Sequence, residues 1–130
     1  ALHVEHPEDS LLLDAATRRN LELETNLRGG TDHTLAAVLD RTQTPMGSRL
    51  LRRWMQRPLR EQDELRRRYQ AITTLRDAPA REPLQRLLRG MGDLERILTR
   101  IALATARPRD LTTLRGGLAR LPELRGLLME

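Results

Sequence analysis

The fold of this chain depends most on residues 11–59, LLLDAATRRNLELETNLRGGTDHTLAAVLDRTQTPMGSRLLRRWMQRPL. Two short apolar runs, residues 11–13 and 21–23, flank a polar segment that begins at Asp14. Asp14 is expected to be a helix N-cap, because its carboxylate can accept the unpaired amide protons of a first helical turn. The pattern predicts strand, helical turn and strand over residues 11–24. Such a ribbon needs further strands, since an isolated pair of strands is marginal in water.

A second helix start lies at Thr44 and Pro45. Thr44 can cap the helix, and Pro45 occupies the first helical position, where its missing N–H costs nothing. The helix predicted over residues 44–56 is amphipathic and ends before Pro58. Its apolar face, in which Leu50 and Trp54 are expected to be packing anchors, comprises Met46, Leu50, Leu51, Trp54 and Met55.

Further helices are predicted by apolar residues at helical spacing. A short helix is expected over residues 34–40, with Leu35, Val38 and Leu39 on one face, and a longer one over about 61–77. Its apolar face comprises Leu65, Tyr69, Ile72 and Leu75.

The periodic pattern continues over residues 82–104 but crosses Gly90 and Gly92. Each glycine costs about 1 kcal/mol in a helix interior, so two helices or a pronounced bend are expected there, with Asp93 as the second N-cap. Another helix is expected to start at Pro108, with Asp110 in its first turn, and to break at Pro122. Its predicted buried stripe comprises Leu111, Leu114, Leu118 and Leu121.

Composition favours a helical protein. The 130 residues are enough for one domain with a single core, which would bury about two thirds of the surface of the unfolded chain. The apolar residues are mostly leucine, with one Trp, one Tyr and no Phe. We therefore predict a mainly α fold, a multi-helix bundle-like core with a short two-strand ribbon near the N-terminus.

All 23 basic residues are arginine. Guanidinium groups bind phosphates bidentately, so arginine enrichment can indicate phosphate recognition. However, a chain that is also rich in Leu, Ala and Gly and lacks Lys is typical of a GC-rich genome, and we prefer that interpretation. The net charge of +5 permits association with nucleic acid or an anionic surface but identifies neither.

Arg49, Arg52 and Arg53 share one face of the helix predicted over residues 44–56. This face would contact DNA phosphates if it met a duplex. Acidic residues follow closely within residues 61–64, and such basic faces are usually solvated or paired within the protein. Direct DNA contact is therefore the weaker of the two interpretations.

The sequence also carries information on the cellular compartment and on the two ends of the chain. The absence of cysteine excludes disulfides and thiolate metal sites and fits a cytosolic protein. No run approaches the roughly 18 apolar residues of a membrane-spanning helix. Residues 1–10 are expected to be a tail or a linker from a preceding domain, and because residue 1 is not Met, we expect an excised piece of a larger protein.

Few residues suggest catalysis or metal binding. His3 and His6 lie near Glu5 and Glu8, a spacing that suits a divalent metal, but a solvated tail is the simpler interpretation. His33 follows an acid and is read as a loop residue in preference to a base.

Asp93 and Glu95, with Arg96 and Arg100, are read as helix caps and surface pairs worth a few tenths of a kcal/mol each, in preference to an acid–base site. The glycine pair at residues 29–30 is not a P-loop, because the chain has no lysine.

Three stretches resemble a known protein family. They are LDAATRRNLEL at residues 13–23, TLAAVLDRTQTPMGSRLLRRWMQRPL at 34–59, and GDLERILTRIALATARPRDLTTLRGGLARLPEL at 92–124. Their motifs are D-x-x-T-x-x-x-L-E, T-P-M-G-x-R-x-L, D-L-E-R and A-R-P-R-D-L. With these motifs, residues 9–128 closely resemble the MutS family of bacterial DNA mismatch-repair proteins.

The resemblance implies that residues 11–130 are the first part of the family's core, or lever, domain. In the family this part follows the mismatch-binding and connector domains and precedes the rest of the core, the DNA clamp and the ATPase. The Phe-x-Glu mismatch-reading motif and the Walker motifs are absent, so no catalytic, cofactor-binding or metal-binding residue is expected here. ATP and Mg²⁺ would belong to the intact protein, a cytoplasmic, nucleoid-associated homodimer on mismatched duplex DNA.

Such a core is expected to couple DNA binding to the ATPase, because packed helices switch between discrete arrangements. Gly90 and Gly92 and the break at Pro122 are the predicted hinges, and alanine at both glycines is expected to stiffen the first. Two alternatives remain: a free-standing helical nucleic-acid binder that uses Arg49, Arg52 and Arg53, and a helical interaction or oligomerisation module.

Overall fold

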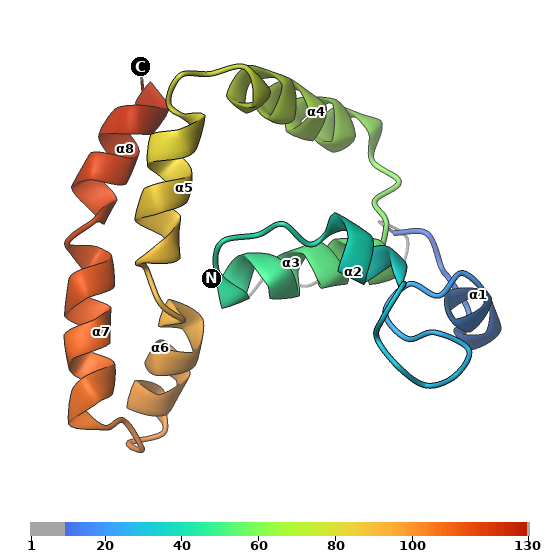
Figure 1. Ribbon diagram of the computed structural model, residues 1–130, viewed down its shortest axis with the longest axis horizontal. Helices are drawn as coiled ribbons and strands as arrows, with labels where there is room; N and C mark the ends of the chain where they lie inside the picture. The colour runs from blue at the N-terminus through green and yellow to red at the C-terminus, as the bar shows by residue number, and fades with distance from the viewer. Residues whose placement is uncertain (1–9, 130) are drawn as a thin grey trace. The chain divides into compact units, whose positions relative to one another are not determined.

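The computed structural model describes residues 10–129, which are mainly helical, as predicted (Figure 1). The chain divides into two compact units. Unit 1 comprises residues 1–41 and 49–72, and unit 2 comprises residues 42–48 and 73–130. The predicted two-strand ribbon is wrong: the β pairing found within residues 10–129 is one isolated antiparallel bridge between Ser10 and Leu59.

Helix α1 (Ala15–Asn20) replaces the ribbon. Asp14 caps it as predicted, accepting a hydrogen bond from the Thr17 N–H at 2.6 Å. The second predicted strand is instead the C-terminal cap of α1. Glu22 has φ +46°, and the N–H groups of Glu22 and Leu23 donate to the last carbonyls of the helix, at Arg19 and Arg18. This is a Schellman motif with glutamate where glycine is usual, and it explains why no strand forms.

The start of helix α2 (Leu35–Leu39) lies against the C-terminal cap of α1. Thr34, which is 1% exposed, accepts from the Ala37 N–H, while the first-turn N–H groups of Leu35 and Ala36 donate to the carbonyls of Glu22 and Leu23. The residues of the supposed strand therefore cap the next helix. The short helix was predicted correctly, but its apolar face is not buried: Leu35, Val38 and Leu39 are exposed, and Ala36 is the buried residue.

Helices α3 (Pro45–Gln56) and α4 (Gln62–Arg76) begin at side-chain caps. The Thr44 hydroxyl accepts from the Gly47 N–H at 3.0 Å, as predicted. The Glu61 carboxylate accepts from the N–H groups of Asp63 and Glu64 at the start of α4. Neither helix contains a buried residue, so their predicted apolar faces are at least partly open to solvent.

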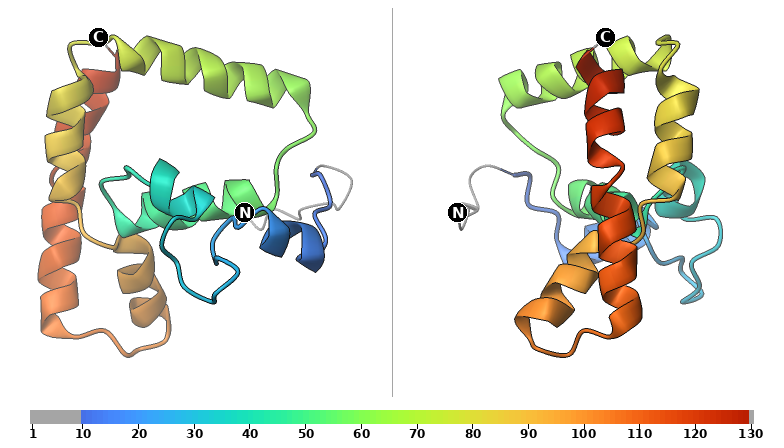
Figure 2. Two further views of the ribbon diagram at one scale, coloured as in Figure 1. Left: turned by 45° about the vertical axis from the view of Figure 1, so that its right-hand side comes forward. Right: turned by 90° about the vertical axis from the view of Figure 1, so that its left-hand side faces the viewer.

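The last four helices belong to unit 2 and form an antiparallel hairpin of two interrupted arms (Figures 1 and 2). The first arm is α5 (Arg81–Arg89) followed by α6 (Leu94–Ala102); the second is α7 (Pro108–Leu118) followed by α8 (Leu121–Met129). Helix α6 packs against α7, and α5 packs against α8. Within residues 10–129 no helix is long and apolar enough to span a membrane.

The interruption of the first arm lies where it was predicted. Gly90 is the C-cap of α5, Gly92 has φ +72°, and Asp93 caps α6 by accepting from the Arg96 N–H at 3.2 Å. In the second arm the break lies just before Pro122, which is in the first turn of α8. A proline ring clashes with the carbonyl four residues earlier, so a helix cannot run unbroken from Leu118 to Pro122.

Few apolar side chains are buried, and the single core expected from the chain length is not observed. Leu23 and Ala36 are buried in unit 1, whereas Leu84, Met91 and Ile97 are buried in unit 2. The predicted stripe on the last arm is wrong, because Leu111, Leu118 and Leu121 are exposed. A helix of a two-arm hairpin has one principal neighbour, so it buries a narrow strip of its surface.

Polar and small residues of α7 form that strip. Asp110 and Gly117 are buried, seven residues apart on one helix face. A Cβ atom at Gly117 would lie 2.8 Å from the Met91 carbonyl oxygen and 2.7 Å from Leu94 Cδ2. The two arms therefore approach too closely for any side chain at residue 117.

An ion pair ties α6 to α7 near the tip of the hairpin. Arg100 Nη1 lies 2.6 Å from Asp110 Oδ1, and the Arg107 N–H donates to Asp110 Oδ2 at 2.9 Å. The Arg107 N–H, with the Arg100 guanidinium, holds the pKa of Asp110 below its ordinary value of 3.8. Asp110 thus caps α7 and fastens it to α6.

Replacing Gly117 with Ala is expected to destabilise the chain by about 1–3 kcal/mol, because the added methyl group meets a backbone carbonyl. Gly116→Ala is the matched control in the same helix. Its Cβ would meet Arg120 Nη1 at 3.9 Å, an ordinary contact, so this variant should be neutral or up to about 1 kcal/mol more stable through helix propensity. Urea denaturation followed by circular dichroism measures both, and equal effects would contradict the close approach.

The Asp110 contacts should make stability depend on pH. Because the pKa of Asp110 is lowered in the folded chain, its contribution is present above the ordinary value of 3.8 and is lost as the pH falls through the lower folded value. Denaturation midpoints of the wild type and of Asp110→Asn should therefore converge as the pH falls below 3.8. A constant difference between the two chains over that range would refute the assignment.

Candidate functional site

The residues predicted as anchors have different surroundings. Asp14 and Thr44 are helix caps, and Pro45 is the first residue of α3, all as expected. The Thr17 N–H holds the pKa of Asp14 below its usual range. Leu50 and Trp54 are not buried anchors, because they are 45% and 40% exposed.

Trp54 instead supports an arginine. The Arg68 guanidinium carbon lies 4.0 Å from the centroid of the Trp54 ring, a cation–π contact between α3 and α4 within unit 1. Arg68 also donates to Glu64 at 3.0 Å, and this hydrogen bond is the main reason why the pKa of Glu64 is lowered. The sequence did not indicate this contact, because it joins residues of two separate helices.

The three arginines predicted to face DNA all have partners within the chain. Arg52 Nη2 lies 3.6 Å from Asp40 Oδ2, and neither Arg49 nor Arg53 is without an interaction. The acids of residues 61–64, which lie close to this face in sequence, pair with arginines of α4. A phosphate group on this face would have to compete with Asp40 for Arg52.

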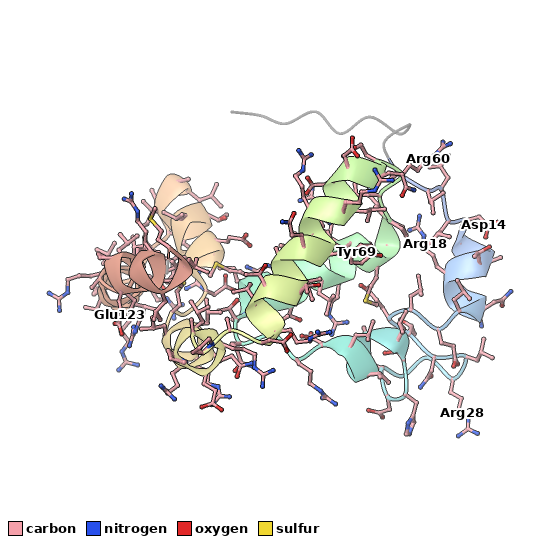
Figure 3. The ribbon with its side chains drawn as sticks, turned by 90° about the horizontal axis from the view of Figure 1, so that it is seen from above. Asp14, Arg18, Arg28, Arg60, Tyr69 and Glu123 are labelled. Atoms are coloured by element: carbon pink, nitrogen blue, oxygen red, sulfur yellow. The ribbon has the colours of Figure 1, made fainter. Side chains whose placement is uncertain are left out.

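Unit 1 contains an open pocket of about 410 Å³ between α1, the loop that follows it and the end of α3. Figure 3 shows Arg18 on α1 and Arg28 on that loop. The Gln56 amide donates to Glu24 Oε2 at 2.8 Å, whereas Glu24 Oε1 is buried without a hydrogen-bond partner. Arg18 and Asn26 also line the pocket, but the lining residues include no histidine or cysteine that could act as base or nucleophile.

The predicted hinge glycines lie beside a residue that the sequence did not single out, Arg120. Its Nη1 atom donates to the Gly90 carbonyl at 2.7 Å and to the Gly116 carbonyl at 3.1 Å. A Cβ at Gly90 would lie 2.7 Å from Arg120 Nη2, and one at Gly92 would lie 2.7 Å from Thr113 Cγ2. Alanine at both positions would meet Thr113 of α7 and the guanidinium of Arg120, and the positive φ of Gly92 disfavours alanine, so the double variant would strain the bend as well as stiffen it.

The weaker chemical candidates gain no support. His33 lies in a turn before the Thr34 cap with φ +61°, which fits a loop residue. Arg100 pairs with Asp110, so it is not part of an acid–base site with Asp93. In the described part of the chain no group of three or more His, Asp or Glu side chains could hold a metal ion, and His3 and His6 lie outside that part.

The comparison with protein families agrees with the resemblance noted in the sequence. The family described as MutS domain III matches residues 16–130, which contain all eight helices of the described residues except the first residue of α1. The match therefore includes the Thr44–Pro45 helix start, the glycine bend and the whole hairpin of unit 2. The chain belongs to the MutS domain III family and is a core segment of a MutS-type mismatch-repair protein.

Proposed function

We propose that this chain is a core, or lever, segment that couples mismatched-DNA binding to the ATPase of the intact protein and catalyses no reaction itself. The observation that carries the proposal is the match to MutS domain III over residues 16–130. The braced hairpin of unit 2 supports it, because two arms tied at Gly117 and at the Arg100–Asp110 pair transmit a displacement better than separate helices.

The exposed apolar side chains support the assignment to a larger protein. Large side chains are exposed on α2, α4 and α7, among them Val38, Tyr69, Ile72 and Leu111. Tyr69, labelled in Figure 3, is 64% exposed. On α4 the exposed residues Tyr69, Ile72 and Leu75 recur at helical spacing, and contiguous apolar surface of this kind marks contact sites. We assign those contacts to the other MutS domains: the connector, the rest of the core, the clamp and the ATPase.

Nucleotide and mismatch recognition are assigned to other parts of the intact protein. The chain has neither Lys nor Phe, so its residues do not fit a Walker A loop or a Phe-x-Glu motif. ATP and Mg²⁺ would act at the ATPase domain of a homodimer on mismatched duplex DNA, in the bacterial cytoplasm near the nucleoid. The role left to this chain is mechanical.

A direct DNA-binding role is the main competing proposal. We expect this chain to bind a labelled duplex weakly and equally with and without one G·T mispair, because the Arg49, Arg52 and Arg53 face is engaged within the chain. Fluorescence anisotropy at two salt concentrations measures this. Mismatch-preferring binding would support the nucleic-acid binder, whereas self-association without DNA, seen by sedimentation, would support the interaction module.

Coupling itself is tested in the intact protein. Gly117→Ala should change the factor by which ATP alters the affinity for a G·T duplex, because it pushes the two arms apart at their closest approach. Gly116→Ala should leave that factor unchanged. Titrations of both variants with and without ATP provide the measurement, and an unaltered factor in Gly117→Ala would argue against the hairpin as the coupling element.

A further inference from the structure

The two arms of the hairpin are interrupted at facing positions. The first arm breaks between Arg89 and Leu94, and the second between Leu118 and Leu121. Because α6 packs on α7 and α5 packs on α8, the breaks divide the hairpin into two half-hairpins (Figure 2). At each break the continuous helical hydrogen bonding stops, so these are the places where the hairpin resists bending least.

One side chain bridges both breaks. Arg120 lies in the break of the second arm, and its Nη1 donates to the carbonyl of Gly90 in the break of the first. The same atom donates to the carbonyl of Gly116 in the last turn of α7. The last carbonyls of a helix lack partners within the helix, so a guanidinium group satisfies acceptors that the breaks leave open.

The guanidinium of Arg120 can occupy this position because residue 90 is glycine. At Gly90 a Cβ would lie 2.8 Å from Arg120 Cζ and 2.7 Å from Nη2, closer than such atoms approach. The planar guanidinium therefore lies directly against the backbone of the first arm. A lysine ammonium is a single charged point and cannot reproduce this flat contact.

We infer that Arg120 is a positioning residue that holds the two half-hairpins in line, and that its release allows the hairpin to bend at the paired breaks. The inference rests on the proposed function only for the use of this bend in coupling. The joint itself is a property of this chain and can be measured without DNA or ATP.

The absence of cysteine makes site-specific spin labelling direct. Labels at Arg86→Cys in α5 and Ala102→Cys in α6 span the joint, and labels at Ala102→Cys and Thr112→Cys lie within the half-hairpin of α6 and α7. All three positions are exposed. Double electron–electron resonance gives the distribution of distances for each pair.

Arg120→Met should widen the distribution for the pair that spans the joint and leave the pair within one half unchanged. Arg120→Lys, which keeps the charge but loses the fork, should widen it by less. Arg125→Met, a change at an exposed arginine of α8, is the control and should alter neither pair.

An unchanged distribution across the joint in Arg120→Met would overturn the inference. Widening of both pairs would also overturn it, since Arg120 would then stabilise the hairpin as a whole. If Arg120→Met widens the distribution across the joint but leaves the coupling of the intact protein unaltered, the role of Arg120 at the joint stands and its link to the proposed function is rejected. If Gly117→Ala leaves the coupling unaltered and Arg120→Met leaves the distance distribution across the joint unchanged, both the proposed coupling role of the hairpin and the inferred role of Arg120 are rejected.

Discussion

The hairpin of unit 2 depends on the close approach of α7 to the segment from Met91 to Leu94, which is possible because residue 117 is glycine. At that point the backbone of one arm and the side chain of Leu94 occupy the space that a Cβ would need. Close approach brings the carboxylate of Asp110 within reach of Arg100 on the neighbouring helix. Packing and electrostatics therefore support each other along one face of α7.

Several arginines make contacts that hold the helices of this chain together. Arg100 fastens α7 to α6, Arg120 joins the two breaks, and Arg68 stacks on Trp54 while it pairs with Glu64. Exposed ion pairs contribute little individually, but a planar guanidinium group that also meets a carbonyl or a ring makes a more directional contact. The arginine-rich composition thus does not by itself indicate phosphate recognition.

The cap residues were predictable because capping is local. Asp14, Thr44 and Asp93 each accept a hydrogen bond from an N–H three residues later, so a window of four residues contains the whole interaction. The strand at residues 21–23 was predicted wrongly for the opposite reason. Glu22 adopts φ +46°, and its carbonyl accepts a hydrogen bond from the first residue of α2, thirteen residues later. Neither feature can be predicted from a glutamate at this position.

The helical class, the helix starts at Asp14, Thr44 and Asp93, the glycine bend and the family could be predicted from the sequence, because these depend on neighbouring residues or on motifs. The tertiary structure alone decided which faces are buried. Leucine at helical spacing marks a face that can be buried, but a helix in a two-arm hairpin buries what its one neighbour covers. On α7 that strip contains Asp110 and Gly117, and the partners of Arg120 follow from the facing of two breaks that lie about thirty residues apart.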